Sequence, residues 1–436
     1  MSVHEHDGPS PGGLTLPALS ESRWLRFSTF TAFYFAQGVP IGLLTIALPA
    51  WMAEQGRDLA EIAGFSAVVG LPWAIKLIMG PLMDRFTFMP MGFRRPWALF
   101  AQFGLAMSFV AIALLGGLEG ESLVLLTTLG FIANAFAASQ DVAIDGMAID
   151  VLPVEDRGRA NAFMACGQRF GFAVFGAITG TLLVMFGLAV AAFTCAVAVG
   201  LVFLLGAIVI ERPGERRMPW SPGAAAEVDR ATEPGVGSYM RQLIVVLFMP
   251  MSILLIAVEF LNRVRDGFAV VVQPIFATIE FGASTEVYTQ ANGIIDLTAA
   301  VVGVCIGPLI DRAGAKRFLL GALVASAALH LLMAFSQSLW KDSTFILPMW
   351  AAISFAGQVI FIAIIAMFMN ICTPSIAATQ FAIYMSLANL SRTAGMGILA
   401  AVGGGLTTQD NFIVMGGLLI AAAAMLVFVR EQRPVV

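Results

Sequence analysis

The sequence predicts an all-α membrane protein with twelve transmembrane helices in two six-helix bundles, and three observations support this fold class. Of the 436 residues, 59% are hydrophobic and only 12% are charged, whereas soluble domains carry roughly a quarter of charged residues. Apolar segments of the length that spans a bilayer recur along the chain. A six-residue motif returns about half a chain length later, which indicates two similar halves.

The repeated motif is Gly-Pro-Leu-Met-Asp-Arg at residues 80–85 and Gly-Pro-Leu-Ile-Asp-Arg at residues 307–312. Each copy follows a long apolar segment and precedes a basic cluster, Arg94-Arg95 in the first copy and Lys316-Arg317 in the second. Self-similarity at this spacing predicts two bundles of related structure.

Twelve apolar segments follow one another, and we expect each to form a membrane-spanning helix, because backbone groups in lipid must bond within their own segment. In the first half they cover residues 27–50, 61–82, 97–117, 123–149, 160–186 and 188–210. In the second half they cover residues 250–277, 286–309, 318–336, 345–371, 378–403 and 411–429.

The polar stretches define the remaining domain boundaries. They are an N-terminal tail at 1–26, a linker at 211–249 whose end forms a short surface helix, and a C-terminal tail at 431–436. The two bundles are therefore expected at residues 27–210 and 250–430.

The distribution of Lys and Arg predicts the orientation of the chain. With the N-terminus inside, the outer loops hold only Arg57 and Lys341, whereas the inner loops and tails hold most of the other basic residues. Both termini are therefore expected in the cytoplasm. The start of the chain lacks a basic-then-apolar pattern, so no cleaved signal peptide is expected.

The repeated motif could form a gate between the halves. Asp84 and Asp311 end helices beside arginines, so ion pairs could join the halves on the inner side and break in another conformation. Alternatively, the basic residues only anchor the loops inside. The residues of this expected gate are Gly80, Asp84, Arg85, Arg94, Arg95, Asp145, Asp150, Gly307, Asp311, Arg312 and Arg317.

Carboxylates within the segment 123–149 indicate function, because an ionisable group at bilayer depth is costly unless it is paired or wet. Asp141 and Asp145 are four residues apart and share a helix face. Two adjacent, poorly solvated carboxylates favour uptake of a proton. Asp145 and Asp150 could instead pair with cytoplasmic arginines; we favour this reading for Asp150 and a functional role for Asp141.

The segment 250–277 places Glu259, Arg263 and Asp266 on one face near mid-membrane. This row of alternating charges is either a substrate-binding surface or a buried ion network. Arg265 is expected to point elsewhere and to reach water.

Further polar residues lie in the apolar segments, and several cations facing one cavity would suit an anionic or acyl-sugar substrate. Lys76 is one such cation, although it could instead extend toward the cytoplasm. The expected substrate and proton pathway comprises Asp141, Arg169, Glu259, Arg263, Asp266, Asp296, Arg392, Gln37, Gln140 and Asn292. Glycines and proline at residues 38–42 predict either a cavity-lining bend or close helix packing.

The sequence gives no sign of an enzyme. The four cysteines have no paired spacing, and His330 stands alone in its segment, so we expect no metal and no cofactor. The expected partners are a small-molecule substrate, protons and the lipid bilayer, without nucleic acid, and the chain is expected to be a monomer.

These patterns resemble the major facilitator transporters, which consist of two related six-helix halves. The repeated stretch is similar to that family's loop signature, Gly-x-x-x-Asp-Arg-x-Gly-x-Arg/Lys-Arg, although the first copy has five extra residues. Within the superfamily the chain looks like the AmpG-type muropeptide permeases and the acetyl-coenzyme A transporters. Residues 139–145 resemble that branch's Thr/Ser-Gln-Asp-Ile-Ala-Ile-Asp, and Arg263 with Asp266 matches its basic-x-x-Asp.

The resemblance implies a proton-coupled symporter of the bacterial inner membrane that imports a muropeptide. In two places the chain departs from the branch: Asn292-Gly293 lacks the usual cation, and Asp296 replaces a small residue. Both changes should weaken recognition of an anionic sugar-peptide. The branch includes siderophore permeases, so a siderophore or another organic anion stays open as substrate. A membrane sensor or assembly factor that transports nothing is the alternative from another class.

Overall fold

The computed structural model describes residues 18–86, 88–115, 122–223, 244–245, 247–372 and 377–429. Every regular element within these ranges is a helix, which confirms the all-α prediction for this part of the chain. Seven of the described helices are long and apolar enough to cross a membrane. They are Arg23–Glu54, Arg95–Leu114, Ser122–Val151, Phe163–Ile208, Ala315–Phe335, Ser343–Ile371 and Thr408–Val427.

The N half, residues 23–208, places a helix on each of the six predicted segments. Its elements are α1 (Arg23–Pro40), η1 (Ile41–Ala47), α2 (Leu48–Glu54), α3 (Leu59–Ile75), η2 (Lys76–Ile78), α4 (Met79–Arg85), η3 (Met89–Met91), α5 (Arg95–Leu114), α6 (Ser122–Val151) and α7 (Val154–Ile208). The helix α7 covers two predicted segments. They meet at Gly187, whose positive φ of 80° is easily adopted only by glycine.

The C half, residues 250–427, also follows the predicted segments. Its elements are α9 (Pro250–Ile275), η4 (Phe276–Glu280), α10 (Thr285–Ala313), α11 (Ala315–Phe335), η5 (Gln337–Leu339), α12 (Ser343–Ile371), α13 (Ala377–Val402), η7 (Gly403–Gly405) and α14 (Thr408–Val427). The helix α9 lies outside the apolar set above; its middle carries Glu259, Arg263, Arg265 and Asp266.

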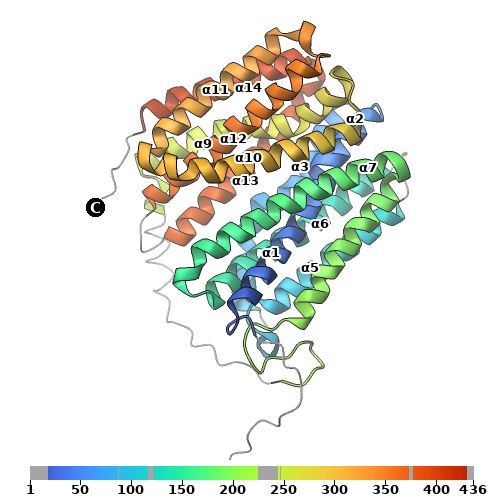
Figure 1. The fold of residues 1–436 in the computed structure, drawn as a ribbon, viewed down its shortest axis with the longest axis vertical. Helices are drawn as coiled ribbons and strands as arrows, with labels where there is room; N and C mark the ends of the chain where they lie inside the picture. The colour runs from blue at the N-terminus through green and yellow to red at the C-terminus, as the bar shows by residue number, and fades with distance from the viewer. Residues whose placement is uncertain are drawn as a thin grey trace, which may run out of the picture.

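The two halves lie side by side as separate groups of helices, blue to green and yellow to red (Figure 1). They meet mainly along two helix pairs: α3 packs on α13, and α7 packs on α10. Charged side chains on these helices can therefore face the other half rather than lipid.

Glycines bring α1 and the first part of α7 into backbone contact. A Cβ atom on Gly38 would lie 2.4 Å from the backbone nitrogen of Phe172, and one on Gly42 would lie 2.6 Å from that of Gly176. Of the two readings of residues 38–42, the structure therefore supports close helix packing. A π-helical turn, Ile41–Ala47, follows Pro40 directly.

The chain is ordered slightly before its first predicted segment. Leu19 and Ser20 donate their backbone N–H groups to the carbonyl oxygens of Ile210 and Glu211, at 2.9 and 3.0 Å. The start of the linker is thereby tied to the N half. Most of the surface helix expected at the end of the linker lies outside the described residues.

Candidate functional site

One group of charges lies in the N half, and we call Tyr34, Lys76, Asp141 and Asp145 the lysine cluster. Lys76 Nζ lies 2.5 Å from Asp141 Oδ2, and its ammonium lies 5.7 Å from the ring centre of Trp73. The Lys76 side chain is 22% exposed and that of Asp141 is 7% exposed. Lys76 therefore pairs with the carboxylate for which the sequence predicts function, rather than extending toward the cytoplasm.

The two other acids of α6 have different partners. Asp145 accepts a short hydrogen bond from the hydroxyl of Tyr34, on α1. Asp150 is exposed and forms an ion pair with Arg94, at 3.5 Å. The pairing with an arginine that the sequence favours for Asp150 is present, whereas Asp145 belongs to the lysine cluster. No sequence pattern identifies Tyr34 as a member of this cluster, because a single tyrosine in an apolar segment has no characteristic spacing.

A second group lies in the C half, and we call Glu259, Arg263, Arg265, Asp266 and Arg392 the arginine cluster. Arg263 Nε lies 2.6 Å from Glu259 Oε1 and its Nη1 lies 3.6 Å from Asp266 Oδ2. Arg392, from α13, lies 3.1 Å from the same Asp266 oxygen. The alternating row predicted on α9 is therefore a continuous ion network that includes a second helix.

Close packing of α9 on α13 explains how Arg392 reaches Asp266. A Cβ atom on Gly267 would lie 2.3 Å from the carbonyl oxygen of Arg392, and one on Gly395 would lie 2.4 Å from that of Val264. Because glycine on both helices lets the backbones touch, Arg392 lies beside Asp266, the residue before Gly267.

Arg265 corrects an expectation, because it does not reach water. It is only 6% exposed, and its Nη2 donates to Asn262 Oδ1 at 2.8 Å. Asn262 in turn donates to Glu259 Oε2 at 2.9 Å. A buried cation needs polar partners, and this local chain of hydrogen bonds supplies them.

Arg169, on α7, has a different environment. Its guanidinium carbon lies 5.5 Å from the ring centre of Phe172 and 5.6 Å from that of Phe361, on α12 of the C half. Arg263 lies at the same distance from Phe361. Arg169 forms no ion pair with a described residue, although Asp296 and Asp266 lie within electrostatic range. Phe361 therefore lies near one arginine of each half.

Asp296 is held by neutral donors. It accepts hydrogen bonds from Asn292, at 3.1 Å, and from Ser354 of α12, at 2.7 Å. Asn292 also contacts Gln273 of α9, at 3.5 Å. Asp296, the acid at which the sequence differs from the AmpG-type branch, thus lies near Arg169 but forms no ion pair with it.

The two expected glutamines are fully buried. Gln140 donates to the carbonyl oxygen of Phe33 at 3.0 Å, and Gln37 accepts from Gln168 at 3.0 Å. In this conformation they join α1 to α6 and α7.

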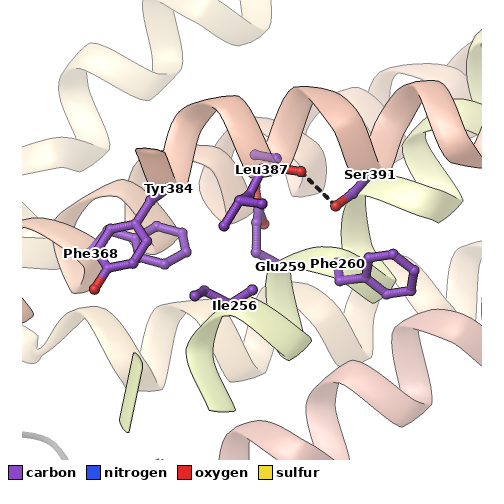
Figure 2. Close-up of a pocket in the computed structure, with 8 residues that line it drawn as sticks. Ile256, Glu259, Phe260, Phe368, Tyr384, Leu387 and Ser391 are labelled. Atoms are coloured by element: carbon purple, nitrogen blue, oxygen red, sulfur yellow. Dashed lines mark hydrogen bonds between the residues drawn. The ribbon is translucent and has the colours of Figure 1, made fainter. Parts of the chain in front are cut away.

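A small cavity lies behind Glu259, between α9, α12 and α13 (Figure 2). Its volume of about 10 Å³ is close to the minimum for one water molecule. Ser391, at its wall, donates to the carbonyl oxygen of Leu387 at 2.7 Å. An organic solute cannot occupy this cavity, so Glu259 faces a space for water at most.

In the first copy of the repeated motif, Arg95 bonds to the N half and to the start of the linker. Arg95 is buried and donates to the carbonyl oxygens of Gly206, Ala207, Arg216 and Arg217. Arg85, Arg312 and Arg317 are exposed, and Gly80 lies in α4. Position 307 lies in α10, whereas the side chains of Asp84 and Asp311 lie outside the part described. The gate role of this motif stays a prediction.

Glu211 is a partner of the motif that the sequence analysis missed. Its carboxylate accepts hydrogen bonds from the backbone N–H groups of Phe93, Arg94 and Arg95, at 3.0, 2.9 and 2.5 Å. Burial raises the pKa of Glu211. Burial, and then the charge of Glu211, raise the pKa of Glu215 to about 7. Glu215 accepts the backbone N–H of Glu211 at 3.0 Å.

The halves are joined by hydrogen bonds at the ends of α2 and α10, and we call Glu54, Thr181, Thr285 and Glu286 the latch. Glu54 Oε2 accepts from the hydroxyl and the backbone N–H of Thr285, at 2.5 and 3.1 Å. Thr181 donates to Glu286 at 3.3 Å. No sequence pattern marks the latch, because acids at helix ends are common and their partners here are distant in sequence.

No group of three or more His, Cys, Asp or Glu residues within the described ranges could hold a metal ion. The groups described above are ion pairs and hydrogen bonds, which suit binding and conformational change.

Comparison with known proteins gives the family. The model of the Major Facilitator Superfamily matches residues 30–264 and again residues 255–436, so it matches each half separately. The chain is 31% identical over 367 residues to the anhydromuropeptide permease of Escherichia coli K12, covering 82% of this chain and 70% of that protein. It is 24% identical over 368 residues, 81% of this chain and 84% of the other, to a protein of Rickettsia conorii that carries the AmpG name. This chain is a multi-pass membrane transporter that belongs to the major facilitator superfamily, in the branch of the AmpG-type permeases.

Proposed function

We propose that the chain is a proton-coupled symporter of the bacterial inner membrane that imports a mid-sized organic solute, with a peptidoglycan-derived muropeptide as the first candidate. The similarity to a permease named for anhydromuropeptide, over most of both chains, supports this substrate class. The proposal includes twelve membrane crossings with both termini in the cytoplasm. The turn at Gly187 supports this number, because it divides α7 into two lengths that could each cross.

The observation that carries the proposal is the position of Arg169. It lies where the halves meet, contacts Phe361 of the other half and has no ion-pair partner among the described residues. Arginine presents several N–H donors in one plane, which suits a carboxylate or phosphate. An anionic group of the substrate would complete this site, and Phe361 and Phe172 would contact the apolar face of a sugar.

The lysine cluster would couple transport to protons. Lys76 and Asp141 form a direct ion pair on two different helices. A proton on Asp141 removes the negative charge that attracts the Lys76 ammonium. Binding of a proton to Asp141 and the ion pair between Asp141 and Lys76 therefore exclude each other. Because Trp73 also accepts a hydrogen bond from Asn389 of α13, at 3.3 Å, a change at Lys76 can act on the contact between the halves.

The latch indicates which side of the transporter is closed in this conformation. In the proposed topology the latch lies at the periplasmic ends of the helices, so the periplasmic entrance is closed here. Import then requires that the latch opens to admit substrate and closes before release inside.

Uptake into proteoliposomes tests the proposal. We expect a labelled anhydromuropeptide to accumulate when the outside is acidic and the accumulation to stop with a protonophore. Asp141→Asn should abolish accumulation, whereas the matched Asp150→Asn, at an exposed ion pair, should change it less than twofold. Accumulation that is unaffected by the protonophore would exclude proton coupling. Normal wall recycling with both Asp141→Asn and Arg263→Ala would favour the non-transporting sensor.

A siderophore or another organic anion is the second candidate, because Asp296 counts against the first one. This acid adds a negative charge near Arg169, which disfavours a strongly anionic sugar-peptide. Growth on a siderophore as the iron source, compared with recovery of wall fragments, separates the two. A substrate preference unchanged by Asp296→Ala would remove this argument for the second candidate.

A further inference from the structure

A groove outside the proposed substrate site runs between α11 and α12. Its volume is about 400 Å³, within the range of ligand sites. Its wall is apolar apart from one charge. The residues that shape it include Arg317, Gly321, Ala322, Ala325, Phe355 and Val359.

The groove is open because its floor consists of small residues. A Cβ atom added to Gly321 would meet no heavy atom within 4 Å. Ala325, one turn further along α11, is exposed. An open apolar groove between two adjacent helices, lined almost entirely by apolar atoms, has the chemistry that suits an acyl chain.

Arg317 gives one end of the groove a charge. It is exposed and forms no ion pair with a described residue. Its neighbour Lys316 is engaged, because Nζ donates to the carbonyl oxygens of Val427 and Val429 at 3.1 and 2.6 Å. A free guanidinium at the basic end of an apolar groove is complementary to an anionic headgroup with its chain beneath.

We propose that this groove binds one anionic phospholipid of the cytoplasmic leaflet, with its phosphate at Arg317 and an acyl chain between α11 and α12. The leaflet follows from the proposed topology. The occupied groove would touch α12 on the side opposite the substrate site. Phe355 and Val359 line the groove, whereas Ser354 and Phe361, on the other face of the same turns, contact Asp296 and Arg169.

Native mass spectrometry of the full-length protein, with phosphatidylglycerol or phosphatidylcholine added in detergent, tests the proposal. We expect one phosphatidylglycerol to be retained in preference to phosphatidylcholine. Arg317→Gln should weaken this binding about fivefold. Arg312→Gln removes a charge at the end of α10, which does not line the groove, and should leave the binding unchanged.

A second pair of variants tests the acyl-chain position. Gly321→Leu fills the groove and should reduce phosphatidylglycerol retention, whereas Gly417→Leu, at an equally open glycine of α14, should not. Equal retention of both lipids, or retention that resists both Arg317→Gln and Gly321→Leu, would overturn the proposal. Because the readout is lipid binding, this outcome leaves the proposed transport function untouched.

Discussion

Each half of the molecule presents one arginine on its fifth predicted segment, and the two arginines have opposite surroundings. Arg392 of the C half lies on α13, and the neighbouring α9 supplies Asp266 at 3.1 Å. Arg169 of the N half lies on α7, but the neighbouring α1 supplies the neutral Gln37, which bonds Gln168. The same helix-pair packing thus yields an ion-paired arginine in the C half, and in the N half an arginine without an ion pair to a described residue. The proposed binding role of Arg169 rests on this difference, whereas Arg392 has a partner within its own half.

The largest expected effect comes from breaking the arginine cluster. Arg263→Ala leaves Glu259, which is 2% exposed, without its ion-pair partner, and an unpaired buried charge costs about 3–5 kcal/mol. We expect loss of folded protein, measured by size-exclusion chromatography and by thermal unfolding. The double variant Glu259→Gln with Arg263→Gln should recover the fold, because neither charge then remains. If Arg263→Ala unfolds at the wild-type temperature, the network does not contribute to stability.

Arg169→Gln should separate binding from stability. Hydrogen bonds to charged groups contribute about 1.5–3 kcal/mol, so uptake at low substrate concentration should fall about ten- to a hundredfold. The melting temperature should stay near that of the wild type, since no ion pair is lost. Arg392→Gln is the matched control and should lower the melting temperature. Equal losses of stability in the two variants would contradict the proposed role of Arg169.

Breaking the latch, whose residues come from both halves, should have a smaller effect. Glu54→Gln and Thr285→Val each remove part of a hydrogen-bonded pair worth about 1–2 kcal/mol. We expect either variant to open the entrance at the latch, measured as faster labelling of a cysteine introduced at Thr289, which is fully buried in the closed form. The double variant should label no faster than the stronger single one. Additive effects would show that the two residues act independently.

The smallest effect concerns Glu215, at the start of the linker. Because its pKa is raised to about 7 in the folded chain, its contribution to stability is fully present below its ordinary pKa. That contribution is lost as the pH rises through about 7. Glu215→Gln should therefore flatten the fall of the melting temperature between pH 5 and pH 8, by on the order of 2 °C. A fall that is identical in the variant would assign the titration to another group.

Much of the fold was accessible from the sequence because lipid imposes simple rules. The apolar segments coincide with helices to within a few residues, and Gly187 divides α7 where two segments were predicted to meet. Spacing along one helix also placed Glu259, Arg263 and Asp266 together. Such predictions need only the period of a helix.

Contacts between helices were less accessible, since no local pattern encodes them. The angular position of Arg265 on its helix predicts a side chain that reaches water, but contacts with Asn262 and Asp266 keep the side chain buried. Phe361 lies in an ordinary apolar run, and nothing in that run marks it as the residue near two arginines. For Lys76, the sequence leaves open whether the side chain faces a cavity or extends toward the cytoplasm. The distance to Asp141 decides between the two.

The glycine contacts have a consequence for observing the transporter at work. Because α1 is locked on α7 and α9 on α13 through backbone contacts, each pair should move as one body, and Arg392 should keep its distance to Asp266. The distance from Arg169 to Phe361 joins the two bodies and has to change whenever they rock. An indole at position 361 would sense that change as a shift in emission, so Phe361→Trp could serve as a built-in optical reporter of turnover.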